Sequence, residues 1–210
     1  MKKYEARFLI KKSLYYRLFK SLNKSLQEDI LERINVLIRE EKAYCDRGNY
    51  QHLSDIFAAI ALYQGLQSRG MTEERAFQTI WDALTLAVQR RRKIMQALAG
   101  KPGFWTIMKT IVPIGFHYGS GKGWRFRWFT TQFKNQYYFE VRECIYQKIF
   151  KKRNLEKLGP MFCRCDLIMY GQLSGIDFQR KGTLCYGEKK CDFKFIRHKK
   201  GKQFQRSHSR

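Results

Sequence analysis

The sequence predicts an α+β fold in which N-terminal helices pack on an antiparallel sheet formed by the C-terminal half. Apolar residues in the first hundred positions recur at helical spacing. Later segments are rich in aromatic residues, β-branched residues and glycine, as strands and their turns are. Because the helical segments come first and the strand-like ones follow, the order favours an α+β chain over alternating βαβ units.

Three helices are expected in the first hundred residues. From Ser25, apolar positions recur every three or four residues and form one face of an amphipathic helix. These positions are Leu26, Ile30, Leu31, Ile34, Leu37 and Ile38. A second helix is expected over about 54–67. Thr72 offers an N-cap for a third, with two acids in its first turn and apolar residues that continue to Val88.

After the turn at 100–103 the chain is expected to form the sheet. The glycine-rich segment 119–123 lacks the spacing of a phosphate-binding loop, so a flexible loop is expected there. A short helix is expected at 163–173. The predicted strands are 137–142, 176–185 and 192–197, the last two joined by a hairpin turn at 186–190.

We expect one α+β domain over residues 1–199, helical over about 1–100 and sheet over about 101–199, followed by a basic disordered tail at 200–210. With 44% hydrophobic and 15% aromatic residues, the chain has ample apolar material for a core. The most apolar segment, 104–116, is too short to span a bilayer and contains Lys109 and Pro113. The start lacks the pattern of a secretory signal, so we expect a cytoplasmic protein with no membrane partner.

The formal net charge is +24, and its distribution matters more than its size. More than half of the excess lies near the two ends, so the charge does not by itself call for a nucleic acid as main partner. No acidic residue occurs between Asp82 and Glu140. The cations of this span, Arg125 and Arg127 among them, would attract a small anionic substrate.

The cysteines concentrate in the last third of the chain. Six cysteines without an export signal are expected to be thiols rather than a disulfide framework. Five of them lie close together in sequence: Cys144, Cys163, Cys165, Cys185 and Cys191.

Three segments around these cysteines form an ordered pattern. They read REC at 142–144, FCRCD at 162–166 and FQRKGTLCYGEKKCDFKF at 178–195. The characteristic positions are Cys144, Cys163 with Asp166, Arg180 with Thr183, Gly187, and Cys191-Asp192-Phe193. Upstream, GLQSRGMTEERAFQTIWDAL and the pair Gly123-Trp124 match more softly. Together these segments resemble the L-2-amino-thiazoline-4-carboxylic acid hydrolase family. In this resemblance GLQSRGMTEERAFQTIWDAL corresponds to the family's helix before the catalytic region, and Gly123-Trp124 corresponds to its aromatic turn.

The resemblance implies a hydrolase acting on carbon–nitrogen bonds in a cyclic amidine, which opens a thiazoline carboxylate to an N-carbamoyl cysteine without a cofactor. Water must add to the ring carbon between nitrogen and sulfur, and sulfur must leave. Asp166 would act as general base or orienting acid, and Arg180 would hold the substrate carboxylate. Thr183 would orient the substrate by a hydrogen bond, and Trp124 would contact it.

The thiols leave two further interpretations open. A thiolate could attack the ring carbon directly, with Cys163 or Cys191 as nucleophile. Alternatively, Cys163, Cys185 and Cys191 could hold a structural zinc ion in a non-catalytic ligand-binding module that resembles 4-vinyl-reductase-type domains. Their spacing is not that of a CxxC knuckle, and zinc analysis separates the two interpretations.

The same residues also have purely structural interpretations. A buried cysteine is usually an inert small apolar side chain. Arg180 could be an exposed charge on a strand, and Asp166 and Asp192 could cap a helix or a turn.

Overall fold

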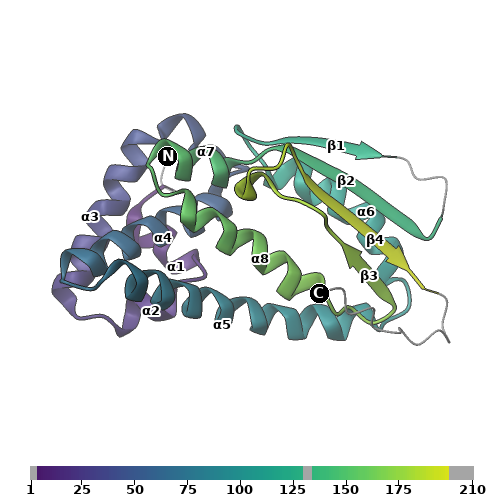
Figure 1. Cartoon of the computed structure of the whole chain (residues 1–210), viewed down its shortest axis with the longest axis horizontal. Helices are drawn as coiled ribbons and strands as arrows, with labels where there is room; N and C mark the ends of the chain where they lie inside the picture. The colour runs from purple at the N-terminus through teal and green to yellow at the C-terminus, as the bar shows by residue number, and fades with distance from the viewer. Residues whose placement is uncertain (1–3, 130–133, 199–210) are drawn as a thin grey trace.

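The computed structural model describes residues 4–129 and 134–198, with the first helices gathered at one end and the strands, flanked by further helices, at the other (Figure 1). The tail expected at 200–210 lies outside the described residues. In chain order the elements are α1 (Ala6–Lys12), α2 (Tyr16–Ser21), α3 (Lys24–Glu40), α4 (Tyr50–Ser68), α5 (Glu73–Ala99), α6 (Phe104–Gly119), β1 (Arg125–Phe129), β2 (Gln136–Glu143), α7 (Ile145–Lys152), α8 (Gly159–Tyr170), β3 (Ile176–Gln179) and β4 (Cys191–Arg197). The α+β prediction is confirmed.

The three helices expected in the first hundred residues are present as α3, α4 and α5. Side-chain caps start two of them: the Asn23 side chain accepts a hydrogen bond from Leu26 N, and Thr72 accepts one from Arg75 N. The helix α4 is enclosed by its neighbours, and residues 53–63 are all buried. It is therefore the central element of the helical part.

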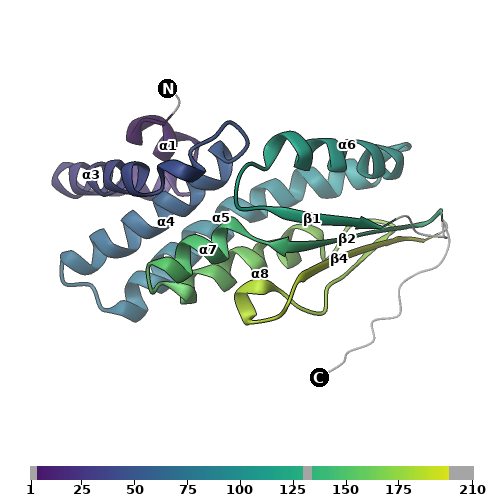
Figure 2. The same ribbon diagram turned by 90° about the horizontal axis from the view of Figure 1, so that it is seen from above.

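Residues 104–119 form helix α6, so the expectation that the sheet part begins near residue 101 is wrong for this segment. Its aromatic and apolar side chains recur at helical spacing and pack against the sheet: Phe104, Trp105, Met108, Val112 and Phe116. Gly103 precedes the helix at φ 82°, a left-handed conformation that favours glycine. Figure 2 shows α6 along the outer side of the molecule, beside the strands.

The sheet has strand order β1-β2-β4-β3, and each neighbouring pair is antiparallel. The strands expected at 137–142 and 192–197 are present as β2 and β4, whereas β1 was not expected. Alternate side chains of β2 and β4 are buried in a core with α6: Tyr137, Phe139, Val141, Phe193 and Phe195.

The strand expected at 176–185 ends at Gln179, so the strand prediction is wrong for residues 180–185. Lys181 N and Gly182 N both donate hydrogen bonds to the Asp192 carboxylate, at 3.0 and 2.9 Å, and turn the chain away from the sheet. A 3-10 turn at Leu184–Tyr186 follows. The interpretation of Asp192 as a turn cap is therefore confirmed.

Two clusters of buried side chains form the core. One lies among the N-terminal helices, α7 and α8, and the other lies between α6 and the sheet. Trp124 and Tyr146 pack against both clusters. No helix within the described ranges is long and apolar enough to cross a membrane.

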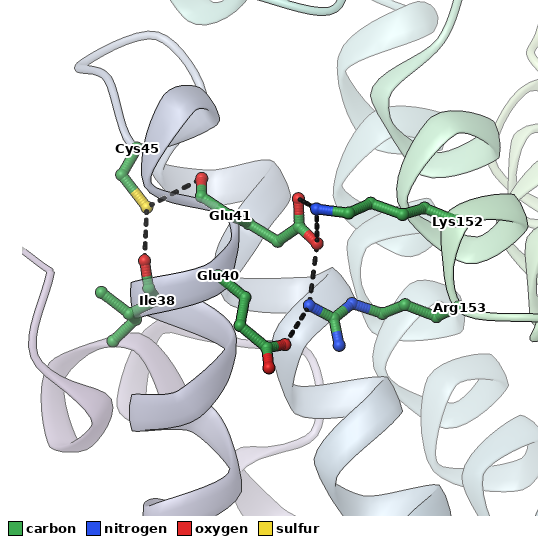
Figure 3. A network of polar contacts seen from close by, with 6 residues as sticks. All are labelled: Ile38, Glu40, Glu41, Cys45, Lys152 and Arg153. Carbon is green, nitrogen blue, oxygen red and sulfur yellow. Dashed lines mark hydrogen bonds and ion pairs between the residues drawn. The ribbon is translucent and has the colours of Figure 1, made fainter.

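A buried carboxylate ties the end of α3 to the end of α7 (Figure 3). The Glu41 side chain is 1% exposed and accepts hydrogen bonds from Lys152 Nζ at 3.0 and 3.1 Å. Arg153 bridges Glu41 and the exposed Glu40, at 2.8 and 2.7 Å. Cys45 lies beside this network, and its thiol is directed at the carbonyl oxygens of Ile38 and Glu41.

Candidate active site

A cavity of about 370 Å³ lies where the helical part meets the inner face of the sheet. Its walls come from α4, α5, α6, α8 and the strands β2 and β4, and they are mostly apolar. The side chains that carry chemistry are few: His52, Asp55, Arg91, Tyr146, Asp166 and the thiols Cys144, Cys163, Cys165, Cys185 and Cys191. A mostly apolar cavity of this size with a few convergent polar groups is typical of a small-molecule site.

Asp166 lies inside α8 and is held by the guanidinium of Arg180. Arg180 Nη1 is 2.7 Å from Asp166 Oδ2, and its Nη2 donates to the Cys163 carbonyl at 2.6 Å. Burial raises the pKa of Asp166 to about 6, although the Arg180 charge and hydrogen bond oppose the shift. Asp166 lines the cavity, and 34% of its side chain is exposed. Asp166 is therefore in the helix interior, which excludes the interpretation as a cap.

Arg180 is not the exposed strand charge that one interpretation gave. Its side chain is 4% exposed, follows the end of β3, and lies against the rings of Phe178 and Phe193. It is not among the residues that line the cavity. The geometry therefore pairs Arg180 with Asp166, and this arrangement leaves the expected contact with a substrate carboxylate without support.

Four thiols lie close together at one end of the cavity: Cys144, Cys163, Cys185 and Cys191. Cys185 forms side-chain hydrogen bonds with both Cys163 and Cys144, which raise the pKa of Cys185 together with burial. The pKa of Cys163 is lowered, chiefly by the neighbouring Cys185 side chain and further by Thr183. Arg180 adds a favourable charge, whereas burial and Asp166 oppose the shift. Cys163 is thus the thiol of this cluster whose surroundings favour the thiolate.

The other expected thiol nucleophile has different surroundings. Cys191 Sγ accepts a hydrogen bond from Leu184 N at 3.2 Å, but burial raises the pKa of Cys191 to about 12. The pKa of Cys165 is also raised, first by burial and then by the charges of Asp166 and Asp55. Neither thiol is favoured as a thiolate.

The zinc interpretation finds no arranged ligand set. Among the residues of 4–129 and 134–198, no group of three or more histidine, cysteine or acidic side chains is placed to hold a metal ion. Cys163, Cys185 and Cys191 lie close to one another, yet two of them are joined by a thiol hydrogen bond.

A second carboxylate, Asp55, faces the same cavity and was not predicted from the sequence. It lies in α4, is 4% exposed, and accepts a hydrogen bond from Leu14 N at 2.8 Å. Burial raises the pKa of Asp55 to about 6, against this bond, a Gln51 bond and the charge of Arg91. A lone acid in the apolar run around residues 53–62 was the signal in the sequence.

Trp124 lines the cavity as expected, and its position is set by Asn49. Asn49 Oδ1 accepts hydrogen bonds from Trp124 Nε1 and Gly121 N, both at 3.1 Å. Asn49 Nδ2 donates to the Lys122 carbonyl at 2.8 Å, so the glycine-rich loop is fixed on the start of α4. The indole packs 4.8 Å from the ring of His52.

His52 completes this wall as a neutral side chain. Burial lowers the pKa of His52 to about 4, and its Nδ1 is 3.2 Å from the hydroxyl of Tyr146. The cations expected to draw in the substrate lie elsewhere, since Arg125 pairs with Glu143 at 2.8 Å and Arg127 lies over the ring of Phe129. Neither lines the cavity.

Comparison with known proteins supports the resemblance drawn from the motifs. A family model described as L-2-amino-thiazoline-4-carboxylic acid hydrolase matches residues 50–195, which include α4, the strands β1 to β3, most of β4 and every residue that lines the cavity except Leu14. No curated protein and no solved structure gives a significant match. The chain belongs to the L-2-amino-thiazoline-4-carboxylic acid hydrolase family.

Proposed function

We propose that this protein hydrolyses a small cyclic amidine of the 2-amino-thiazoline-4-carboxylate type and releases an N-carbamoyl-cysteine-type product. The observation that carries the proposal is the presence of Asp166, with its raised pKa, in a mostly apolar cavity that the family match encloses. A carboxylate with a pKa of about 6 is ionised at neutral pH and still basic enough to accept a proton from water.

The reaction needs one water molecule and no redox partner. Asp166 takes a proton from water as the water oxygen bonds to the ring carbon between nitrogen and sulfur. The carbon–nitrogen double bond opens, the carbon–sulfur bond then breaks, the proton of the added hydroxyl passes to the ring nitrogen, and the proton held by Asp166 passes to the departing sulfur. The product carries the water oxygen as a urea carbonyl and a new thiol, so atoms and charges balance. Arg180 serves as a positioning residue that holds Asp166.

A thiolate route through Cys163 is the second candidate, favoured by the lowered pKa of Cys163. Its sulfur would bond to the ring carbon, the ring sulfur would leave, and water would then displace Cys163 to give the same product. The two routes differ in whether a covalent adduct forms on the chain.

The test is turnover of L-2-aminothiazoline-4-carboxylate by the purified protein, followed by thiol release and by mass spectrometry of the product. We expect equal amounts of new thiol and N-carbamoyl cysteine. An intact ring after prolonged incubation with folded protein would overturn the proposal.

Variants of two cysteines separate the routes. Cys163→Ser should leave most of the rate if Asp166 activates water, and should lower it about 1,000-fold or more if the thiolate attacks. Cys45→Ser is the matched control, because Cys45 lies outside the cavity and burial raises its pKa to about 11. Mass spectrometry of the quenched protein then shows whether an adduct is present.

A further inference from the structure

Arg91 differs from its neighbours in the basic run at 90–93, because it alone of them lines the cavity. Within α5 it shares a face with Val88 and Met95, three residues before it and four after it, and both of these also line the cavity. Arg90 and Lys93 are exposed and do not line the cavity. Arg92 bonds to Gln172 instead.

Among the lining residues of the described chain, Arg91 is the one lysine or arginine. His52 is neutral because burial lowers its pKa. Arg180 is paired with Asp166 and does not line the cavity. Arg91 is therefore the permanently charged cation of the cavity lining that an anionic group of a bound molecule can contact. Arg91 is exposed, so it reaches both the cavity and the solvent from which a ligand arrives.

We propose that Arg91 binds the carboxylate of the cyclic substrate and selects for rings that carry one. This inference rests on the proposed function and replaces Arg180 in the role first expected for it. Arg91 and Asp55 both line the cavity, and the charge of Arg91 lowers the pKa of Asp55, so the cavity offers a cation and a carboxylate to one bound molecule. A ring with a carboxylate at one end and an amidinium at the other matches that pair, with its amidinium toward Asp55.

The experiment compares the binding of two rings that differ in the carboxylate, L-2-aminothiazoline-4-carboxylate and 2-amino-2-thiazoline, measured by calorimetry. Arg91→Ala should weaken binding of the carboxylate ring about 10- to 100-fold, the range of a lost charge-assisted hydrogen bond. Binding of the ring without a carboxylate should change less than about threefold by the same reasoning. Arg91→Lys should recover part of the lost affinity, since the charge remains but the planar fork does not.

Arg90→Ala is the matched control, because it removes the same charge one residue away and does not touch the cavity. It should leave the affinity for both rings within about twofold. Equal weakening of both rings by Arg91→Ala, or equal effects of Arg90→Ala and Arg91→Ala, would overturn the inference. Because binding is the readout, carboxylate selection through Arg91 can be found even if no ring is hydrolysed, which would overturn the proposed function alone.

Discussion

Carboxylates at the junction of α3 and α7 and carboxylates in the cavity have different surroundings. Glu41, between α3 and α7, faces two cations, Lys152 and Arg153 (Figure 3). In the cavity, Asp166 has one guanidinium, and Asp55 has a backbone amide and an amide side chain but no directly bonded cation. Burial raises the pKa of both aspartates to about 6.

The difference separates a structural carboxylate from chemically useful ones. A buried carboxylate with two bonded cations joins the elements that carry those cations, and its removal takes a buried partner from both. A buried carboxylate with fewer partners changes its protonation near neutral pH, which general acid–base chemistry requires. Glu41 should therefore act on stability, and the cavity aspartates on activity and on the pH dependence of stability.

The largest effect is expected from Asp166→Asn. Loss of the general base should lower kcat about 1,000-fold, toward the upper part of the range for such groups. In the wild type, kcat/KM should fall as the pH drops below about 6, because Asp166 becomes protonated. Initial rates of thiol release over pH 4.5–8.5 measure both effects.

Asp166→Asn also needs a check on folding, since it removes the ion pair of the buried Arg180 and leaves the hydrogen bond from Arg180 to the Cys163 carbonyl. Circular dichroism and a melting curve at the assay temperature provide it. A folded Asp166→Asn variant with a wild-type rate would remove the distinction between the two kinds of carboxylate.

Glu41→Ala should destabilise the fold by about 3 kcal/mol, because two cations at the junction lose a buried partner. The rate per folded molecule should stay within about twofold, since the network lies outside the cavity. Urea unfolding and active-fraction titration measure the two quantities. Glu40→Ala is the control: this exposed carboxylate also binds Arg153, and its loss should cost less than about 1 kcal/mol.

The sequence predicts the helical part well because its signals are local. The N-caps and the apolar spacing of α3 and α5 need no information from elsewhere in the chain. It fails at α6, where aromatic and β-branched residues suggested strands although their spacing was helical. It also fails at residues 180–185, where the Asp192 carboxylate ends the strand through a contact ten or more residues away.

The candidate site divides in the same way. Cys163, Asp166, Arg180 and Thr183 form one ordered motif in the sequence, and the structure brings them together, although Arg180 and Thr183 do not line the cavity. Asp55 and Arg91 lie in helices far from that motif: Asp55 stands out only as an acid within an apolar run, and Arg91 is one cation of a basic run. Only the packing of α4 and α5 around the cavity shows that their side chains face the same space.

A smaller effect is expected in the pH dependence of stability. Because burial raises the pKa of Asp55 from 3.8 to about 6, the folded chain holds this proton more tightly than the unfolded chain. The resulting stabilisation is complete below about pH 4 and is lost as the pH rises through 6. Relative to Asp55→Asn, the wild type should lose about 2 kcal/mol between pH 4.5 and pH 7 by this linkage. The free energies of unfolding of both proteins are measured in urea across that pH range. A constant difference between them would contradict the raised pKa of Asp55.

The smallest effect concerns the wall that holds the cavity rather than its carboxylates. Trp124→Phe keeps an aromatic ring beside His52 but removes the 3.1 Å hydrogen bond from the indole to Asn49. Since Asn49 Oδ1 retains its bond from Gly121 N, we expect a loss of about 1 kcal/mol in stability. KM should rise about threefold with kcat nearly unchanged, because the substitution loosens a binding surface and leaves Asp166 in place. Trp128→Phe, at a tryptophan that does not line the cavity, should change neither KM nor kcat. A fall in kcat for Trp124→Phe alone would instead place this wall among the groups that act on the reacting atoms.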